Sequence, residues 1–289
     1  MLTDREKNLK SIVNASGFVF QLSVMDNVQR TKDSHGWGVL AHEHPWRNNV
    51  NGDEGYIDLV LKKNRNRLII ECKRRQDASW VFLNPDTRHD EVDLARFLWA
   101  DIKITPHTWI LTNGIKPGGP AYDIISGSYD FAMVPASPES EFCVIRGSGE
   151  NDKPLLERIC GQLLRAIDCL SVEEMIINKT KEIHDASVYI PAIITNAKLE
   201  LCTFDPGKVS LSDGILKEGK FRTLPFIRFR KSLTTGLTSQ ASPSNIADAN
   251  KDKERTILII NADFFCEMLE NMQVKLPPFT EPWPWFCRR

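Results

Sequence analysis

Two short apolar segments each carry charged residues at their centres. Asp58 lies within residues 56–61 (YIDLVL), and Glu71 and Lys73 lie within residues 68–74 (LIIECKR). Successive side chains of a strand point to opposite faces. If the two segments pair as a hairpin with their apolar residues toward one core, Asp58, Glu71 and Lys73 project together from the other face.

This arrangement of two acids and one amine suits a divalent metal ion. Carboxylates and an ammonium group are costly to bury at mid-strand unless they pair or bind a cation. Mg²⁺ takes oxygen ligands, commonly one or two carboxylates together with a substrate phosphate. We therefore predict that Asp58 and Glu71 bind Mg²⁺ or Mn²⁺ and that the Cys72 carbonyl adds another oxygen. Lys73 would then contact the attacking water or the scissile phosphate.

The same residues carry a resemblance to a known family. The sequence GYID at 55–58, followed after an apolar run by ECK at 71–73, resembles the motif of the PD-(D/E)XK restriction-endonuclease-like superfamily. This resemblance implies an αβββαβ core, Mg²⁺-dependent cleavage of phosphodiester bonds, and a metal bound by the Asp and the Glu. The resemblance extends more loosely to residues 36–47, 153–170 and 189–195.

Two positions depart from the family pattern. Ile57 replaces the proline that often precedes the motif aspartate, and many members of the family lack that proline too. Many members also place a glutamate on the first helix, facing the metal. The counterpart here is Gln21, with Asp26 one turn later. The neutral amide can still offer an oxygen, but it lowers the negative charge of the site.

Several further residues are candidates for the site. Glu43 could be another metal ligand or a base, although a solvent-exposed strand end is an equally good interpretation. Arg74 and Arg75 are predicted to contact nucleic-acid phosphates, with an ordinary polar strand end as the alternative. Gln162 could line the site from a helix, but we prefer a solvated helix face. Basic and aromatic residues alternate over 226–231 and could bind bases, yet a half-buried strand is the preferred interpretation.

Helical and extended segments surround the hairpin. Residues 4–30 are predicted to be mostly helical, with Phe18, Leu22, Met25 and Val28 on one apolar face. The clearest helix covers residues 153–178 and has a broad apolar stripe. The other expected elements are a strand at 37–42, a loop at 44–55, a helix at 90–102, strands at 107–114, 131–137, 141–147, 187–195, 198–205 and 226–232, a loop at 232–253, a strand at 255–262 and a helix at 263–272.

These elements predict one α/β domain of 289 residues. The expected fold class is a restriction-endonuclease-like mixed central sheet flanked by helices. Its core would use residues 1–80 and 150–205, with an insertion at 81–149 and a C-terminal extension at 206–289.

Composition places the chain among ordinary globular proteins, with 42% hydrophobic and 26% charged residues. The net charge of −1 does not indicate a nucleic-acid partner, but a basic face can be offset by acidic residues elsewhere. Seven cysteines without a CxxC pair argue against a disulfide framework and against structural zinc. The sequence shows no signal peptide and no membrane-length apolar run, so we expect a cytoplasmic protein with no membrane partner.

The predicted function is Mg²⁺-dependent hydrolysis of phosphodiester bonds in DNA, with RNA a less favoured substrate. A prokaryotic restriction or defence role fits the resemblance, and the expected partner is a second copy or a larger defence complex. Two alternatives stay open. Gln21 in place of an acid allows a catalytically inactive endonuclease-like module that binds nucleic acid or protein. A metal-dependent hydrolase of nucleotides or small phosphates is the other alternative.

Overall fold

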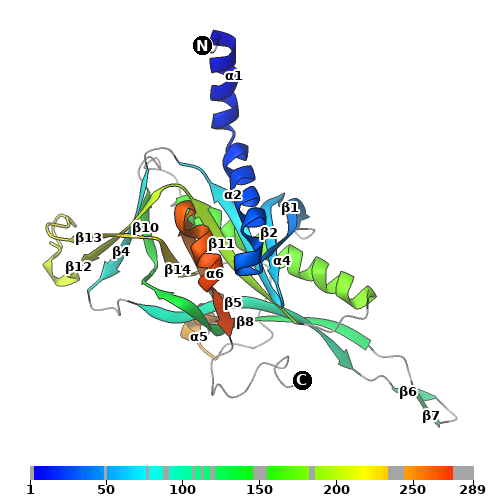
Figure 1. The fold of residues 1–289 in the computed structure, drawn as a ribbon. Coiled ribbons are helices and arrows are strands. Elements are labelled where there is room, and N and C mark those ends of the chain that lie inside the picture. The colour runs from blue at the N-terminus through cyan, green and yellow to red at the C-terminus, as the bar shows by residue number, and fades with distance from the viewer. Residues whose placement is uncertain are drawn as a thin grey trace.

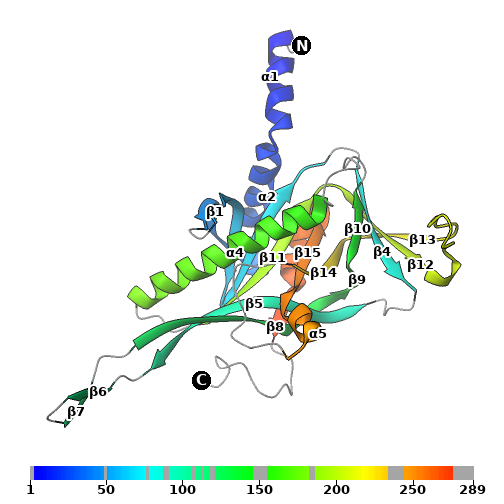
Figure 2. The same ribbon diagram turned by 180° about the vertical axis from the view of Figure 1, so that it is seen from behind.

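The protein is built on one large mixed sheet with helices against both faces (Figures 1 and 2). The helices are α1 (Asp4–Ala15), α2 (Phe18–Arg30), α3 (Lys32–His35), α4 (Leu155–Thr180), α5 (Ile246–Lys253) and α6 (Phe265–Asn271). This computed structural model describes residues 3–48, 51–75, 78–86, 91–105, 108–111, 114–117, 121–145, 155–181, 186–233 and 244–275.

The strands of the large sheet combine antiparallel and parallel pairs. In order across the sheet they are β1 (Gly38–Arg47), β2 (Glu54–Lys63), β3 (Asn66–Lys73), β11 (Ser187–Thr195), β15 (Glu254–Asn261), β14 (Phe226–Ser232) and β9 (Glu139–Ser140). The hairpins β1–β2 and β2–β3 are antiparallel, whereas β11 runs parallel to β3 on one side and to β15 on the other. The centre of the sheet is therefore β11.

Two apolar cores cover the two faces of this sheet. Helix α4 lies across one face, and α2 and α6 lie on the other (Figures 1 and 2). All nine residues of β11 are buried. Its side chains alternate between the cores, with Ile193 on the α4 side and Ile194 on the α2 side. Strands buried on both faces are continuous apolar runs, which accounts for the sequence SVYIPAIIT.

Further strands extend the structure sideways. A long ribbon of β5 (Val92–Thr105) and β8 (Ala121–Ser137) attaches to the start of β11 and also pairs with β16 (Gln273–Lys275). The hairpin of β6 (Thr108–Leu111) and β7 (Gly114–Pro117) lies beyond the end of the ribbon (Figure 1). A second sheet contains β10 (Phe142–Ile145), β4 (Ser79–Pro85), β12 (Lys198–Phe204) and β13 (Lys220–Leu224).

A buried polar cluster fixes α4 to the sheet beneath it. Glu174 accepts hydrogen bonds from the Arg67 Nε of β3 at 2.8 Å and from the Tyr189 hydroxyl of β11 at 2.8 Å. Arg67 is 5% exposed, and Tyr189 is fully buried. Because β3 also carries Glu71, this cluster sets the position of α4 relative to that acid.

Much of the expected architecture is confirmed. The chain forms a mixed sheet flanked by helices, and the predicted hairpin, the helix at 153–178 and the strands at 187–195 and 255–262 are present. The segment 226–232 is strand β14, in which Arg228 is fully buried, as expected for a strand rather than a nucleic-acid surface. Among the described residues, no helix is both long and apolar enough to cross a membrane.

The helix predicted at 90–102 is wrong, because this segment is strand β5. Phe97 packs on the α2 side of the sheet, while Leu98 and Ile102 pack on the α4 side. A strand buried on both faces gives a dense apolar run that periodicity alone does not distinguish from a helix.

Two other expectations need correction. The buried face of α2 is formed by Gln21, Val24 and Val28, whereas Phe18 and Leu22 are 58% and 56% exposed. The predicted loop at 232–253 contains α5, whose first turn is capped by the Asn245 side chain. The middle of that loop lies outside the described residues.

The cluster around Glu174 yields a stability prediction. Glu174→Ala leaves the buried Arg67 guanidinium without its carboxylate, so we expect the free energy of unfolding to fall by roughly 2–4 kcal/mol. Glu173→Ala is the matched control, because the neighbouring Glu173 side chain is 50% exposed and its ion pair should contribute less than about 1 kcal/mol. Urea denaturation measures both, and equal losses would contradict the assignment.

Candidate functional site

The β2–β3 hairpin opens at the point where the sequence predicts the site. Its ladder of paired residues ends at Leu59 and Ile70. At the next residue, Asp58, the carboxylate Oδ2 accepts a hydrogen bond from the backbone N–H of Cys72 at 2.6 Å. The Asp58 side chain therefore takes the place of a backbone bond between the strands and is held between them.

Glu71 and Lys73 lie together on one face of β3. Glu71 Oε1 and Lys73 Nζ form an ion pair, and their side chains are 20% and 34% exposed. Ile69, two residues before Glu71, packs in the core beneath α4. Because side chains alternate along a strand, Glu71 and Lys73 also lie on the α4 side of the sheet.

Asp58 stands among negative charges in a half-buried position. Burial, and after it the negative charge of Glu71, raises the pKa of the Asp58 carboxyl from 3.8 to about 7. Glu43 raises this pKa too, whereas the Cys72 N–H and the Lys73 ammonium lower it. One amine thus faces three carboxylates, and a bound cation would offset the remaining negative charge.

The side chain of Gln21 joins Glu43 to Asp58. Gln21 lies on the buried face of α2, and its Nε2 donates hydrogen bonds to Glu43 Oε1 and to the Asp58 backbone carbonyl, the latter at 3.1 Å. The sequence suggested an oxygen from Gln21, but it is the amide nitrogen that points at these acceptors. Glu43 is half-buried rather than a solvated strand end, and it brings a third acid to the site from β1.

Glu43 has an unusual backbone conformation. Its φ is 48°, in the left-handed region, although it lies within β1. The β1–β2 ladder pairs His42 with Leu59 and His44 with Ile57, so Glu43 lies level with Asp58. Such a conformation costs a residue with a side chain about 1–3 kcal/mol and is found most often at functional sites.

The chemistry of these donors fits a hard divalent cation. Among the described residues, no three His, Cys, Asp or Glu side chains form a group that could enclose a metal ion. Asp58 is turned to the Cys72 N–H, and Glu71 is turned to Lys73. Mg²⁺ is usually held by one or two carboxylates and by substrate phosphates, so a site of this kind needs no complete protein cage.

Cys72 contributes to this site through its backbone. Burial raises the pKa of the Cys72 thiol well above its ordinary value, so the sulfur stays protonated and is a poor metal ligand. The thiol packs against the core on the α2 side of the sheet. The carbonyl oxygen is therefore the atom of Cys72 that could serve as a ligand.

The two arginines that follow the motif differ in their surroundings. The Arg74 guanidinium donates a hydrogen bond to the Asn14 carbonyl of α1, which ties that helix to the end of β3. The side chain of Arg75 is exposed, and its backbone N–H donates to Asn196 Oδ1 at 2.7 Å. Arg75 is thus the better placed of the two to meet a ligand from solvent.

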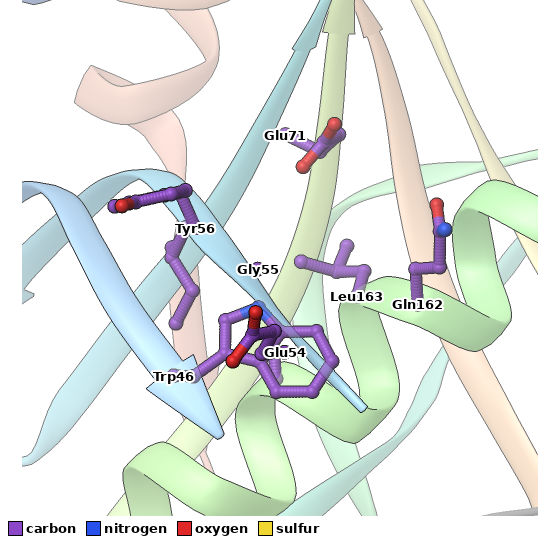
Figure 3. Close-up of a pocket in the computed structure, with 9 residues that line it drawn as sticks. Trp46, Glu54, Gly55, Tyr56, Glu71, Gln162 and Leu163 are labelled. Atoms are coloured by element: carbon purple, nitrogen blue, oxygen red, sulfur yellow. The ribbon is translucent and has the colours of Figure 1, made fainter. Parts of the chain in front are cut away.

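A pocket adjoins Glu71 on the α4 side of the hairpin (Figure 3). It has a volume of about 160 Å³, and its lining includes Trp46 of β1, Tyr56 of β2 and Gln162 of α4. Gln162 is exposed on α4, as expected for a solvated helix face, and its side chain also borders this pocket. Trp46 was not recognised because residues 44–55 were expected to be a loop, whereas Trp46 pairs with Gly55 across two strands. Tyr56 lies in the predicted strand, but the strand pattern alone does not place it beside a pocket.

The raised pKa of Asp58 predicts how stability depends on pH in the absence of metal. Its folded pKa of about 7 exceeds the unfolded value, so the stabilisation by the protonated carboxyl is lost as pH rises from about 4 to 7. Asp58→Asn cannot ionise. We expect its advantage over the wild-type protein to grow by roughly 2–3 kcal/mol between pH 5 and pH 8.

Urea unfolding in EDTA at the two pH values measures this effect. Asp33→Asn, on the exposed side of α3, sets the baseline for the loss of one negative charge. If the stability advantage of Asp58→Asn is the same at both pH values, ionisation of Asp58 does not destabilise the folded protein, which would contradict the raised pKa.

The backbone of Glu43 gives a second prediction. Glycine in a strand is normally less stable than alanine, but at a left-handed residue the order reverses. We expect Glu43→Gly to be about 1 kcal/mol more stable than Glu43→Ala. Asn64→Gly, at φ 54° in the β2–β3 turn, is the control. Its gain in stability over the wild-type protein should be smaller, because Asn tolerates the left-handed conformation. A more stable Ala variant in urea denaturation would contradict the conformation.

Comparisons with known proteins assign this chain to no family. No family model matches the sequence, and no curated protein or solved structure is significantly similar to it.

Proposed function

We propose that the protein is a Mg²⁺- or Mn²⁺-dependent nuclease that hydrolyses phosphodiester bonds in DNA. The observation that carries the proposal is the cluster of Asp58, Glu71, Glu43 and Lys73 at the opening of the β2–β3 hairpin. Two of the acids and the amine occupy the positions of the motif that resembles the PD-(D/E)XK superfamily. The mixed sheet with α4 on one face is compatible with a restriction-endonuclease-like arrangement of this core.

Asp58 and Glu71 are the proposed metal ligands, with the Cys72 carbonyl as a further oxygen. When bound, the divalent ion would polarise the scissile phosphate and lower the pKa of a water molecule. The carboxylate of Asp58 is already aligned, because the Cys72 N–H holds one of its oxygens. Its raised pKa means that metal binding competes with a proton, so affinity should increase as pH rises toward and above 7.

Lys73 and Glu43 complete the proposed chemistry. The Lys73 ammonium can orient the attacking water and stabilise negative charge on the phosphate oxygens, since it lies next to Glu71 on the same face. The oxygen of this water forms the new bond to phosphorus while the bond to the leaving sugar oxygen breaks. Glu43 would accept the proton that the water loses, and the leaving oxygen takes a proton from solvent. Gln21 acts as a positioning residue, because its amide holds the Glu43 carboxylate beside Asp58.

The proposed substrate and partners follow from the surroundings of this site. Arg75 is exposed next to the motif and could contact a backbone phosphate, while Arg74 is partly engaged with α1. With a net charge of −1, affinity for DNA would come from such a local patch or from a second copy. Helix α1 buries no residue of its own and extends away from the sheet, which leaves room for a homodimer or defence-complex contact (Figure 1).

A catalytically inactive endonuclease-like module is the second candidate. Two observations favour it: no three side chains of the described residues enclose a metal, and Gln21 replaces an acid on the first helix. Such a module would bind nucleic acid or protein without cleaving it.

The test of the proposed function is nicking of supercoiled plasmid DNA in the presence of Mn²⁺. We expect Asp58→Ala, Glu71→Ala and Lys73→Ala each to lower the rate at least about 100-fold, because each removes a ligand or the charge-stabilising amine. Lys62→Ala, an exposed lysine of the same hairpin, is the control and should keep full activity.

Circular dichroism checks that each variant is folded, and calorimetry with Mn²⁺ separates the two candidates. Full nicking by purified Glu71→Ala would refute the proposed site. Wild-type protein that neither nicks DNA nor binds Mn²⁺ would favour the inactive module.

A further inference from the structure

The pocket beside Glu71 has the dimensions of a site for a single ring system. Its volume of about 160 Å³ lies well below the roughly 300–1,000 Å³ of pockets that hold drug-sized ligands. Figure 3 shows Trp46 and Glu54 at one end of the pocket and Glu71 at the other, with Leu163 and Gln162 along one side. A ligand in this pocket would therefore be next to one of the proposed metal ligands.

Aromatic and apolar side chains give the pocket flat walls. The Trp46 indole lies against Gly55, where an added Cβ would come within 3.1 Å of Trp46 Nε1. Glycine thus allows the ring to lie close against β2. Tyr56 is 64% exposed and its ring points away from Glu71 (Figure 3), so the Trp46 indole supplies the aromatic wall. The buried Leu163 forms part of the floor on the α4 side. An aromatic wall of this kind binds planar rings by stacking.

The polar groups of the pocket decide which planar ring fits. Glu54 and Glu71 present carboxylate acceptors, and Gln162 presents an amide with both a donor and an acceptor. The Gln162 side chain forms no hydrogen bond with any other described residue, so its amide is available to a ligand. Two carboxylates repel a phosphate, so an uncharged base would enter the pocket rather than the backbone of a nucleic acid.

We propose that this pocket binds one unstacked nucleobase that carries an exocyclic amino group. This inference rests on the proposed function: the base would belong to the nucleotide next to the phosphodiester held at Asp58 and Glu71. Adenine, cytosine and guanine each carry an exocyclic amino group that can pair with a carboxylate or a glutamine, whereas thymine carries none. An unpaired base enters such a pocket more readily than a base in a duplex, because no base pair has to be broken first.

Binding of free nucleosides tests the pocket without any metal or cleavage. Saturation-transfer NMR in EDTA would compare adenosine, cytidine and thymidine. We expect saturable binding of adenosine and cytidine, with thymidine at least about fivefold weaker. Trp46→Leu and Gln162→Ala should each weaken adenosine binding about tenfold. Gln29→Ala removes the same amide from the exposed face of α2 and should change nothing.

Cleavage of single-stranded oligodeoxynucleotides provides the second readout. With Mn²⁺, we expect kcat/KM for oligodeoxynucleotides of adenosine or cytidine to exceed kcat/KM for oligodeoxynucleotides of thymidine at least about fivefold. Gln162 lies on an exposed helix surface, so Gln162→Ala should fold normally. In this variant the ratio of the kcat/KM values should fall to about one. Circular dichroism verifies the fold of Trp46→Leu.

The two readouts separate this inference from the proposed nuclease function. Cleavage without nucleoside saturation and without any effect of Gln162→Ala would overturn the base-binding pocket while the nuclease function stands. Nucleoside binding that depends on Trp46 and Gln162, in a protein that cleaves nothing, would support the pocket and refute the nuclease. Acids and aromatic rings also attract organic cations. Saturable binding of choline without binding of adenosine or cytidine would therefore overturn the proposal.

Discussion

The position of the Asp58 carboxylate governs the site. It accepts the Cys72 N–H at 2.6 Å just where the backbone ladder between β2 and β3 ends, and it does so beside Glu71 and Glu43. A carboxylate in this position is well oriented, but its charge is poorly neutralised, because Lys73 is, among the described residues, the single cation beside three acids at this site. The sheet therefore presents a preformed, partly desolvated negative centre, which is the requirement of a cation site.

The surrounding structure supports that centre at some cost to stability. Glu43 keeps a left-handed backbone within a strand, and the Gln21 amide donates a hydrogen bond to the Glu43 carboxylate. The Glu174 cluster fixes α4 above β3. This position of α4 also forms one wall of the pocket beside Glu71. Strain and unneutralised charge of this kind persist where function requires them and where the remaining core is large enough to tolerate them.

Sequence patterns predicted the hairpin and its acids because strand alternation is a local property. The apolar neighbours of Glu71 determine which face that acid takes, and no distant contact is needed to see it. Around Asp58 the alternation is broken, because Ile57 packs in the core on the α4 side and Leu59 in the core on the α2 side. The sequence pattern did not identify β5 as a strand. Phe97 and Leu98 pack into two different cores, and these two cores exist only in the tertiary structure. The link from Gln21 to Glu43 was hidden for a similar reason, because it depends on how closely α2 approaches β1. The pocket was missed because Trp46 belongs to a strand rather than to the expected loop.

The most direct test of this account is a crystal structure of the protein soaked with Mn²⁺ and measured at a wavelength that reveals the ion by anomalous scattering. We predict an anomalous peak at coordination distance from oxygens of both Asp58 and Glu71, with the Lys73 ammonium displaced from Glu71 toward the solvent side of the ion. A peak at some other part of the protein, or a site that stays empty at saturating Mn²⁺ with Asp58 deprotonated, would contradict it.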